Sequence, residues 1–163
     1  MAPSVADAGP LHYLVLIGHI GLLPDLFGRV VAPAAVGAEL MRPQTPRSVR
    51  DWIAAPAAWF ALLPDPAGAE ALPVRLDPGE RAAIALAETL SATSLLSDDR
   101  AARAVASARG LDVVGTLGIL GRGARRGLLD LPAAVARLRA TNFRHRPQML
   151  DDLLARHRQG DEG

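Results

Sequence analysis

The chain has 163 residues, of which half are hydrophobic, and its formal net charge is +1. This length and composition predict one folded domain with a sizeable core and argue against disorder. The absence of cysteine excludes disulfides, zinc–thiolate sites and thiol catalysis. All 18 basic residues are Arg, and the absence of lysine excludes a Walker P-loop and Schiff-base chemistry.

Charge is distributed unevenly along the chain. Residues 1–99 carry six Arg and eleven acids, whereas residues 100–158 carry twelve Arg and four acids. This asymmetry fits a cation site beside a basic rim that binds a polyanion, and it fits ordinary solvated helix faces equally well. No apolar run has membrane-spanning length, and the first residues lack the features of a signal peptide. We therefore expect a soluble cytoplasmic protein.

In the first half of the chain, short apolar runs alternate with helical patterns. Ser4–Asp7 is expected to be a strand that ends in an acid. Glu39 falls in the last turns of a helix that begins at Pro33. The helix dipole disfavours an acid there, so a bound cation or an Arg partner explains the presence of Glu39 better than helix capping does. The expected helices are Leu11–Ile17, Ile20–Phe27, Pro33–Met41 and Arg47–Ala55, and the expected strands are Arg29–Ala32 and Trp59–Leu63.

The stretch Leu76–Arg103 organises the second half, with a pattern of turn, helix, strand and helix. Pro78 stands where the first turn of a helix tolerates proline. Ser94–Ser97 has the length of a buried strand, and it stops at Asp98 and Asp99. A last strand is expected at Asp112–Val114, and helices at Arg100–Arg109, Leu117–Gly127, Pro132–Ala140 and Pro147–Arg158. We expect Asp65–Pro73 to be an exposed connection, residues 1–158 to form one domain and residues 159–163 to be a frayed tail.

Strands that alternate with helices predict an α/β protein, a three-layer α/β/α fold with a mostly parallel sheet of about five strands. In such a sheet Asp7 and Asp98 follow neighbouring strands and are expected to lie level with each other. Glu80 opens the helix that leads into the fourth strand. Each acid by itself is explained by helix capping. If they converge, a bound Mg²⁺ or Mn²⁺ is the simplest explanation, because unneutralised carboxylates repel and raise one another's pKa.

Five sequence blocks in order resemble those of PIN-domain proteins. The blocks are VADAGPL, VVAPAAVGAEL, LDPGERAAIALA, LLSDDRAAR and VVGTLGIL, and the tail NFRHRPQMLDDLL resembles a last helix of the same family. They look most like the bacterial branch related to VapC toxins, in which similar DxxPL, GE-x-x-A-I and GTLG blocks recur. The resemblance covers about residues 4–155, nearly the whole chain.

This resemblance implies a metal-dependent endoribonuclease in which water attacks an RNA phosphodiester. The residues that match the family's acids are Asp7, Glu39, Glu80 and either Asp98 or Asp99. The resemblance implies that all of these are catalytic, and that all except Glu39 ligate Mg²⁺ or Mn²⁺. Thr116 matches a hydroxyl residue near the site. The chain departs from the family at Gly9, where many relatives carry Ser or Thr, and at Glu80, where many carry the shorter Asp.

The adjacent acids Asp98 and Asp99 are expected to have different roles, because neighbouring side chains diverge. The broad family pattern favours Asp99 as the ligand, whereas the closer branch favours Asp98. Asp98 is expected to be the first residue beyond the strand, and Asp99 is better placed to cap the following helix. We therefore expect Asp98 to be the ligand and Asp99 the cap.

The basic half is expected to supply a phosphate track for RNA, and Arg is also a natural anchor for the acidic tail of an antitoxin. The arginines expected in this track are Arg100, Arg103, Arg122, Arg125 and Arg126. The apolar helices Leu11–Ile17 and Ile20–Phe27 would support a homodimer.

Other functions and roles stay open at this stage. One is a PIN-like interaction module with weak or no nuclease activity, which Gly9 favours. Phosphoryl transfer by a receiver-like or haloacid-dehalogenase-like domain is disfavoured, because those folds rely on a lysine. Trp52 and Trp59 suit base stacking or packing, and packing is the favoured interpretation.

Overall fold

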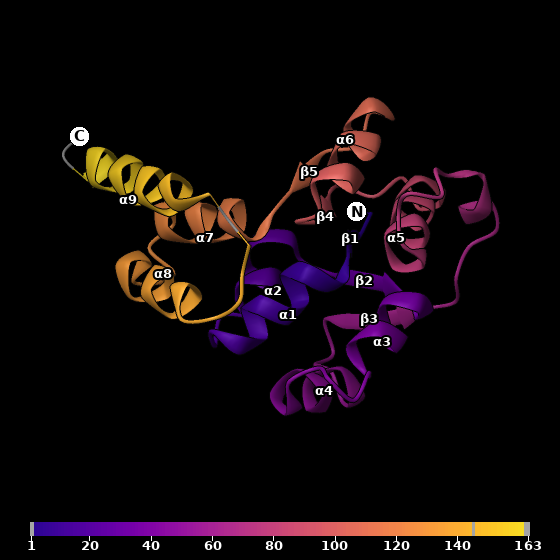
Figure 1. The fold of residues 1–163 in the computed structure, drawn as a ribbon. Coiled ribbons are helices and arrows are strands. Elements are labelled where there is room, and N and C mark those ends of the chain that lie inside the picture. The colour runs from indigo at the N-terminus through magenta and orange to yellow at the C-terminus, as the bar shows by residue number, and fades with distance from the viewer. Residues whose placement is uncertain (1, 145, 162–163) are drawn as a thin grey trace.

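The structure, a computed structural model, describes residues 2–144 and 146–161. It is an α/β protein with one five-stranded sheet in the order β3-β2-β1-β4-β5, and all four strand pairs are parallel (Figure 1). The strands are β1 (Ser4–Ala6), β2 (Val30–Pro33), β3 (Phe60–Leu63), β4 (Leu95–Leu96) and β5 (Val113–Val114). The predicted α/β fold and number of strands are confirmed, and the sheet is parallel throughout.

Helices connect consecutive strands and also follow the last strand. Those before β4 are α1 (Ala8–Leu16), α2 (Leu22–Phe27), α3 (Ala34–Leu40), α4 (Arg47–Ala54), a 3-10 turn (Ala69–Ala71) and α5 (Pro78–Thr89). Those after β4 are α6 (Arg100–Ala108), α7 (Thr116–Arg125), α8 (Leu131–Arg139) and α9 (Pro147–Asp161). Every predicted helix is present, with ends shifted by at most three residues.

One of these shifts has a local cause. Helix α1 begins three residues before the predicted Leu11, because the Asp7 side chain accepts a hydrogen bond from the Ala8 N–H and Pro10 lies in the first turn, where a missing N–H costs little. Helix α9 continues past Arg158 to Asp161. Met1, in the predicted domain, and residues 162–163, in the predicted tail, lie outside the described residues.

The core lies on both faces of the sheet, because successive strand side chains point to opposite sides. On one face Val5 and Leu95 pack in a cluster with α5 and α6. On the other face Ala6 and Leu96 belong to a larger cluster with α1, α2, α7 and α8. The three-layer arrangement follows from this alternation.

The C-terminal helices pack against α1, beyond the sheet edge formed by β5 (Figure 1). The Tyr13 hydroxyl donates to Asn142 Oδ1 at 2.9 Å, and its ring meets that of Phe143 edge-on at 5.0 Å between centroids. Arg137 Nη1 donates to the Ile17 carbonyl at 3.1 Å. Leu153, on α9, is buried against the larger cluster. These contacts join α1, near the start of the sequence, to the C-terminal helices.

Trp52 and Trp59 pack together, with ring centroids 5.8 Å apart, and both contact the Phe60 ring. Both indoles are half-buried against the larger cluster, so the packing interpretation of these residues is confirmed. Within the part of the chain that the structure describes, no helix is long and apolar enough to cross a bilayer.

Candidate functional site

Asp7 and Asp98 follow the neighbouring central strands β1 and β4. The register pairs Ala6 with Leu96, and the Asp7 N–H donates to the Leu96 carbonyl at 2.8 Å. Ser97, and not Asp98, is therefore level with Asp7, so the predicted alignment is wrong by one residue. The reason is that Ser97 still belongs to the sheet: its N–H donates to the Val114 carbonyl at 3.0 Å. Its hydroxyl lies 3.3 Å from Asp7 Oδ2 and donates to it.

The Asp7 carboxyl is almost fully buried, with 6% of the residue exposed. Burial raises its pKa to about 7, although the hydrogen bond that Oδ1 accepts from the Ala8 N–H opposes this increase. Nearby acids raise the pKa further; they are Asp77, Glu80 and Glu39. These three residues and Asp7 form the acid cluster.

Asp77 and Glu80 meet at the start of α5, where they form a capping box. The Glu80 N–H donates to Asp77 Oδ1 at 2.7 Å, and the Asp77 N–H donates to Glu80 Oε2 at 2.9 Å. Burial raises the pKa of Glu80 to about 7 against this backbone hydrogen bond, and the charges of Asp77, Asp99 and Glu39 contribute. Sequence analysis missed Asp77, although its position three residues before Glu80 is the spacing of a capping box.

Glu39 reaches the acid cluster from the last turns of α3. Burial, followed by the charge of Asp77, raises its pKa, whereas Arg42 lowers it. Gly79 leaves room for these carboxylates: a Cβ at this position would lie 3.0 Å from Glu39 Oε2 and 3.4 Å from Asp77 Oδ1. The cluster therefore brings carboxylates from β1, α3 and α5 to one end of the sheet.

Asp98 lies in different surroundings. Its Oδ1 accepts a hydrogen bond from the Thr116 N–H at 2.7 Å, and its Oδ2 accepts one from Thr116 Oγ1 at 2.5 Å. Burial raises its pKa, whereas the two Thr116 bonds and the charge of Arg103 lower it. A Cβ on Gly9 would lie 3.1 Å from Asp98 Oδ2, so the first turn of α1 covers this carboxylate closely. Asp99 instead caps α6, as expected, and accepts from the Ala102 N–H at 2.9 Å.

The acids do not form a closed metal cage. Among residues 2–144 and 146–161, no three acidic or His side chains are grouped closely enough to hold one ion. Mg²⁺, however, is commonly held by one or two carboxylates together with water and substrate phosphates. Carboxylate oxygens are suitable ligand atoms. A cation would offset both the burial and the mutual repulsion that raise the pKa of Asp7 and Glu80. The acid cluster therefore fits a hydrated hard cation.

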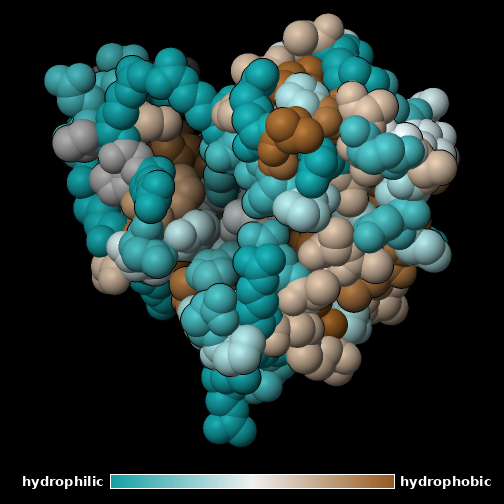
Figure 2. Space-filling view, turned by 45° about the vertical axis from the view of Figure 1, so that its right-hand side comes forward, coloured by the Kyte–Doolittle hydropathy of each residue, from teal (hydrophilic) through white to brown (hydrophobic). Residues whose placement is uncertain are grey.

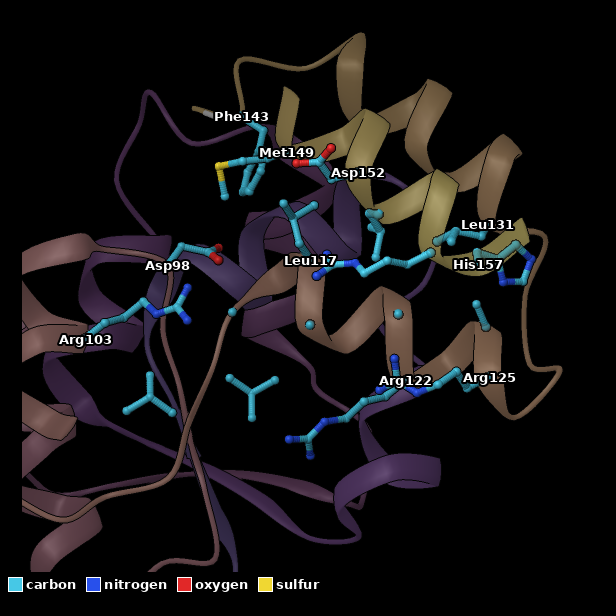
Figure 3. Close-up of a pocket in the computed structure, with 18 of the residues that line it drawn as sticks. Asp98, Arg103, Leu117, Arg122, Arg125, Leu131, Phe143, Met149, Asp152 and His157 are labelled. Atoms are coloured by element: carbon cyan, nitrogen blue, oxygen red, sulfur yellow. The ribbon is translucent and has the colours of Figure 1, made fainter. Parts of the chain in front are cut away.

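A cavity of about 950 Å³ extends from Asp98 between α7 and α9 (Figure 3). Three of the five arginines expected to bind RNA line it: Arg103, Arg122 and Arg125. Arg100 is exposed on α6, and Arg126 Nη1 donates instead to the Asp25 carbonyl at 2.7 Å. Arg144 and Arg156 also line the cavity. Sequence analysis missed these two arginines, because they are far from the acids in the sequence and nothing in it shows that they lie close to Asp98 in the fold.

The sheet is parallel throughout, and carboxylates follow its central strands beside a basic cavity. This combination is that of a nuclease-like α/β fold. A family model described as a PIN domain matches residues 3–159, and the chain belongs to the PIN-domain family. PIN domains are generally nucleases and typically use divalent metal ions. No curated protein and no solved structure shows a significant match to the chain.

Proposed function

We propose that this protein is a metal-dependent endoribonuclease of the VapC-like branch, the toxin of a toxin–antitoxin pair. The observation that carries the proposal is the acid cluster, in which burial and mutual repulsion raise the pKa of Asp7 and Glu80 to about 7. Buried carboxyls crowded together near an arginine-lined cavity are suited to a cation and a phosphodiester.

In this proposal Mg²⁺ or Mn²⁺ is held by one or two carboxylates drawn from Asp7, Glu80 and Asp98, with water and substrate phosphate as its other ligands, and Glu39 adds negative charge nearby. When bound, the ion supplies an activated water and balances charge on the phosphate. Thr116 fixes the orientation of the Asp98 carboxylate through its two hydrogen bonds. Arg103, whose positive charge lowers the pKa of Asp98, would bind the scissile phosphate. Asp99 has an indirect role in the site, because it caps the N-terminus of α6.

The test is cleavage of a fluorophore–quencher RNA with Mg²⁺ or Mn²⁺. Glu39→Gln and Glu80→Gln should each remove most of the cleavage, and Glu88→Gln, on the exposed part of α5, is the matched control. Bound metal should also raise the melting temperature by mass action. Calorimetry that detects no binding at millimolar Mn²⁺ would contradict the metal site, and a Glu39→Gln or Glu80→Gln protein with the parent rate would exclude that residue.

A non-catalytic interaction module is the second candidate. It is favoured by the hydrogen bonds that already occupy Asp98 and Glu80, and by Gly9 in place of a hydroxyl residue. Under this alternative the acids serve as helix caps, and neither metal binding nor cleavage is expected. The same calorimetry separates the two candidates.

The partners we propose are RNA, a cognate antitoxin and a second copy of the chain, in the cytoplasm. The apolar helices α1 and α2 contribute most of their large side chains to the core, among them Leu11, Leu14 and Leu23. A homodimer through these helices would therefore rest on half-buried Val15 and Leu16. Sedimentation of the chain alone and after co-expression with the product of an adjacent reading frame tests both associations.

A further inference from the structure

Tyr13 lies on α1 one helical turn beyond Gly9, so the two residues are on the same face of the helix. A Cβ on Gly9 would lie 3.1 Å from Asp98 Oδ2, which places this face of α1 against the candidate site. Burial and the charge of Asp98 both raise the pKa of the Tyr13 hydroxyl. Tyr13 is therefore near a candidate catalytic carboxylate, although the proposed reaction gives it no role.

The Tyr13 side chain attaches the segment that follows α8, residues 140–144, to α1. Its hydroxyl donates to Asn142 Oδ1 at 2.9 Å across 129 positions of sequence, and its ring meets the Phe143 ring edge-on at 5.0 Å between centroids. The Thr141 hydroxyl makes local hydrogen bonds, with residues two and three positions away, that shape the segment itself. We call the contacts of Tyr13 with Asn142 and Phe143 the clasp.

The segment that the clasp holds forms part of the cavity wall. The cavity of about 950 Å³ opens at the surface as a cleft between the C-terminal helices and the β5 edge of the sheet (Figure 2). Phe143 and Arg144 line this cavity, and Asp98 lies at one end of it (Figure 3). The charge of Arg144, like that of Asp98, acts on the Tyr13 hydroxyl. The clasp thus fixes a wall of the cavity and a positive charge near its Asp98 end.

A second contact joins the C-terminal helices to the other end of α1. Arg137 Nη1, on α8, donates to the carbonyl of Ile17, the C-cap of α1, at 3.1 Å. Helix α8 is therefore held independently of Tyr13, and loss of the clasp would release the 140–144 segment without detaching α8. Asn142 is exposed, so water can satisfy its amide, and the clasp acts mainly by restricting where the segment lies.

We propose that Tyr13 is a positioning residue, whose clasp holds Arg144 at the Asp98 end of the cavity so that the guanidinium meets a substrate phosphate. The phosphate contact rests on the proposed ribonuclease function, whereas the clasp does not depend on it. A guanidinium binds phosphate through N–H donors in a fixed planar arrangement, so the contact requires the backbone that carries it to be held in place.

The first experiment measures amide hydrogen exchange by NMR in the full chain, without metal or RNA. Tyr13→Phe keeps the ring and removes the hydroxyl, and Asn142→Ala removes the acceptor of its hydrogen bond. Ser94→Ala is the matched control, because it removes one side-chain hydrogen bond, to Asp112, at the opposite end of β4 from Asp98. Melting temperatures verify that all variants fold.

Exchange of the Phe143 amide should accelerate roughly fivefold in Tyr13→Phe and in Asn142→Ala, the factor that one hydrogen bond of typical net strength supplies. Ser94→Ala should accelerate exchange in the central strands and leave the Phe143 amide unchanged, because its lost hydrogen bond is broken by global unfolding and not by local opening of the segment. Unchanged exchange at Phe143 in Tyr13→Phe, or an equal acceleration there in Ser94→Ala, would overturn the clasp.

The second experiment measures kcat and KM for the fluorophore–quencher RNA with Mn²⁺. Arg144→Ala should raise KM about tenfold, and Tyr13→Phe roughly twofold to fivefold, with kcat kept within about twofold. The double variant Tyr13→Phe/Arg144→Ala should be no worse than Arg144→Ala alone, because Tyr13 acts through Arg144. Ser94→Ala should keep the parent values.

The outcomes separate the clasp from the nuclease. A parent that cleaves RNA and a Tyr13→Phe protein with the parent KM would retain the nuclease and reject the positioning role. Additive effects in the double variant would also reject it, since Tyr13 would then act independently of Arg144. Faster exchange at Phe143 in a protein that cleaves no RNA would contradict the nuclease, and with it the phosphate contact, while retaining the clasp.

Discussion

Asp7 and Asp98 follow adjacent strands of one sheet, and burial raises the pKa of both carboxyls, but the groups that face them differ. Asp7 faces the three other acids of the cluster, with Ser97 and the Ala8 N–H as donors. Asp98 faces Thr116 and the positive charge of Arg103. At Asp98 the Thr116 hydrogen bonds and the charge of Arg103 oppose the effect of burial on the pKa, whereas at Asp7 the charges of the neighbouring acids add to it. A shared place in the fold therefore does not imply a shared electrostatic role.

The largest effects are expected for Asp7→Asn and Asp98→Asn. The two variants should lose RNA cleavage alike but change the free energy of unfolding in opposite directions. Asp7→Asn and Asp98→Asn should each lower RNA cleavage by about three orders of magnitude, because metal binding contributes several kcal/mol to the transition state. In metal-free buffer Asp7→Asn should increase the free energy of unfolding, since it removes the cost of burying an ionised carboxyl and its repulsion from the other acids of the cluster. Asp98→Asn should decrease it by about 1 kcal/mol, because Asn cannot accept both Thr116 hydrogen bonds. Urea titrations and single-turnover rates measure both.

Asp99→Asn is the control for Asp98→Asn. Because Asn also caps helices, this variant should keep its stability within a few tenths of a kcal/mol and retain most of its metal affinity. Loss of metal affinity in Asp99→Asn alone would show that Asp99, and not Asp98, is the ligand.

The second prediction concerns pH. The pKa of Asp7 rises from 3.8 to about 7 on folding, so between these pH values the folded state binds the proton more tightly than the unfolded state does. The stability that the protonated carboxyl contributes is fully present below about pH 4 and is lost as the pH rises to about 7, by at most about 1.4 kcal/mol per pH unit. Glu80 acts in the same direction. Mg²⁺ should reduce this loss by binding the ionised form.

Urea midpoints between pH 4 and 8, in EDTA and in Mg²⁺, check this prediction. His12 and His19 oppose the effect, since burial lowers the pKa of both imidazoles and stability then rises with pH. Comparison with Asp7→Asn cancels their contribution, and the variant should show the flatter profile. Identical profiles for parent and variant would contradict the raised pKa of Asp7.

A smaller effect is expected at the Asp98 side of the comparison. Thr116→Val removes the hydroxyl donor to Asp98 Oδ2 while keeping the backbone N–H donor. The pKa of Asp98 should rise, and the acid limb of the cleavage pH profile should move upward, with a cost of about 1 kcal/mol in stability. Thr116→Ser retains the hydroxyl and should restore the parent profile; a profile that moves equally in both variants would reject the hydrogen-bond explanation.

The smallest effect is expected at Gly9. Ala at this position in α1 gains about 1 kcal/mol in helix propensity. Its Cβ would lie 3.1 Å from Asp98 Oδ2, and Asp98 cannot move away freely because Thr116 holds both oxygens. The two terms should nearly cancel, so the melting temperature of Gly9→Ala is expected to stay within a few degrees of the parent value. A large decrease would show that Asp98 cannot move away from the added Cβ.

The local hydrogen bonds were accessible from the sequence because they join residues a fixed number of positions apart. Asp99 precedes a helical pattern and accepts from the N–H three residues later, as an N-cap does. Asp77 and Glu80 have the same separation, so their capping box also follows from spacing alone. The alternation of strands and helices likewise depends on short-range periodicity, and it predicted the parallel α/β fold.

Long-range pairings were decided only by the tertiary structure. Thr116 meets Asp98 across 18 positions and Ser97 meets Asp7 across 90, and both contacts depend on strand register. The one-residue error in aligning Asp98 with Asp7 arose because a pattern of apolar residues does not show where a strand stops pairing. Arg156 joins the cavity at Asp98 through the packing of α9 on α7. Local spacing determines caps and periods, whereas burial, charge proximity and cavities depend on which distant surfaces pack together.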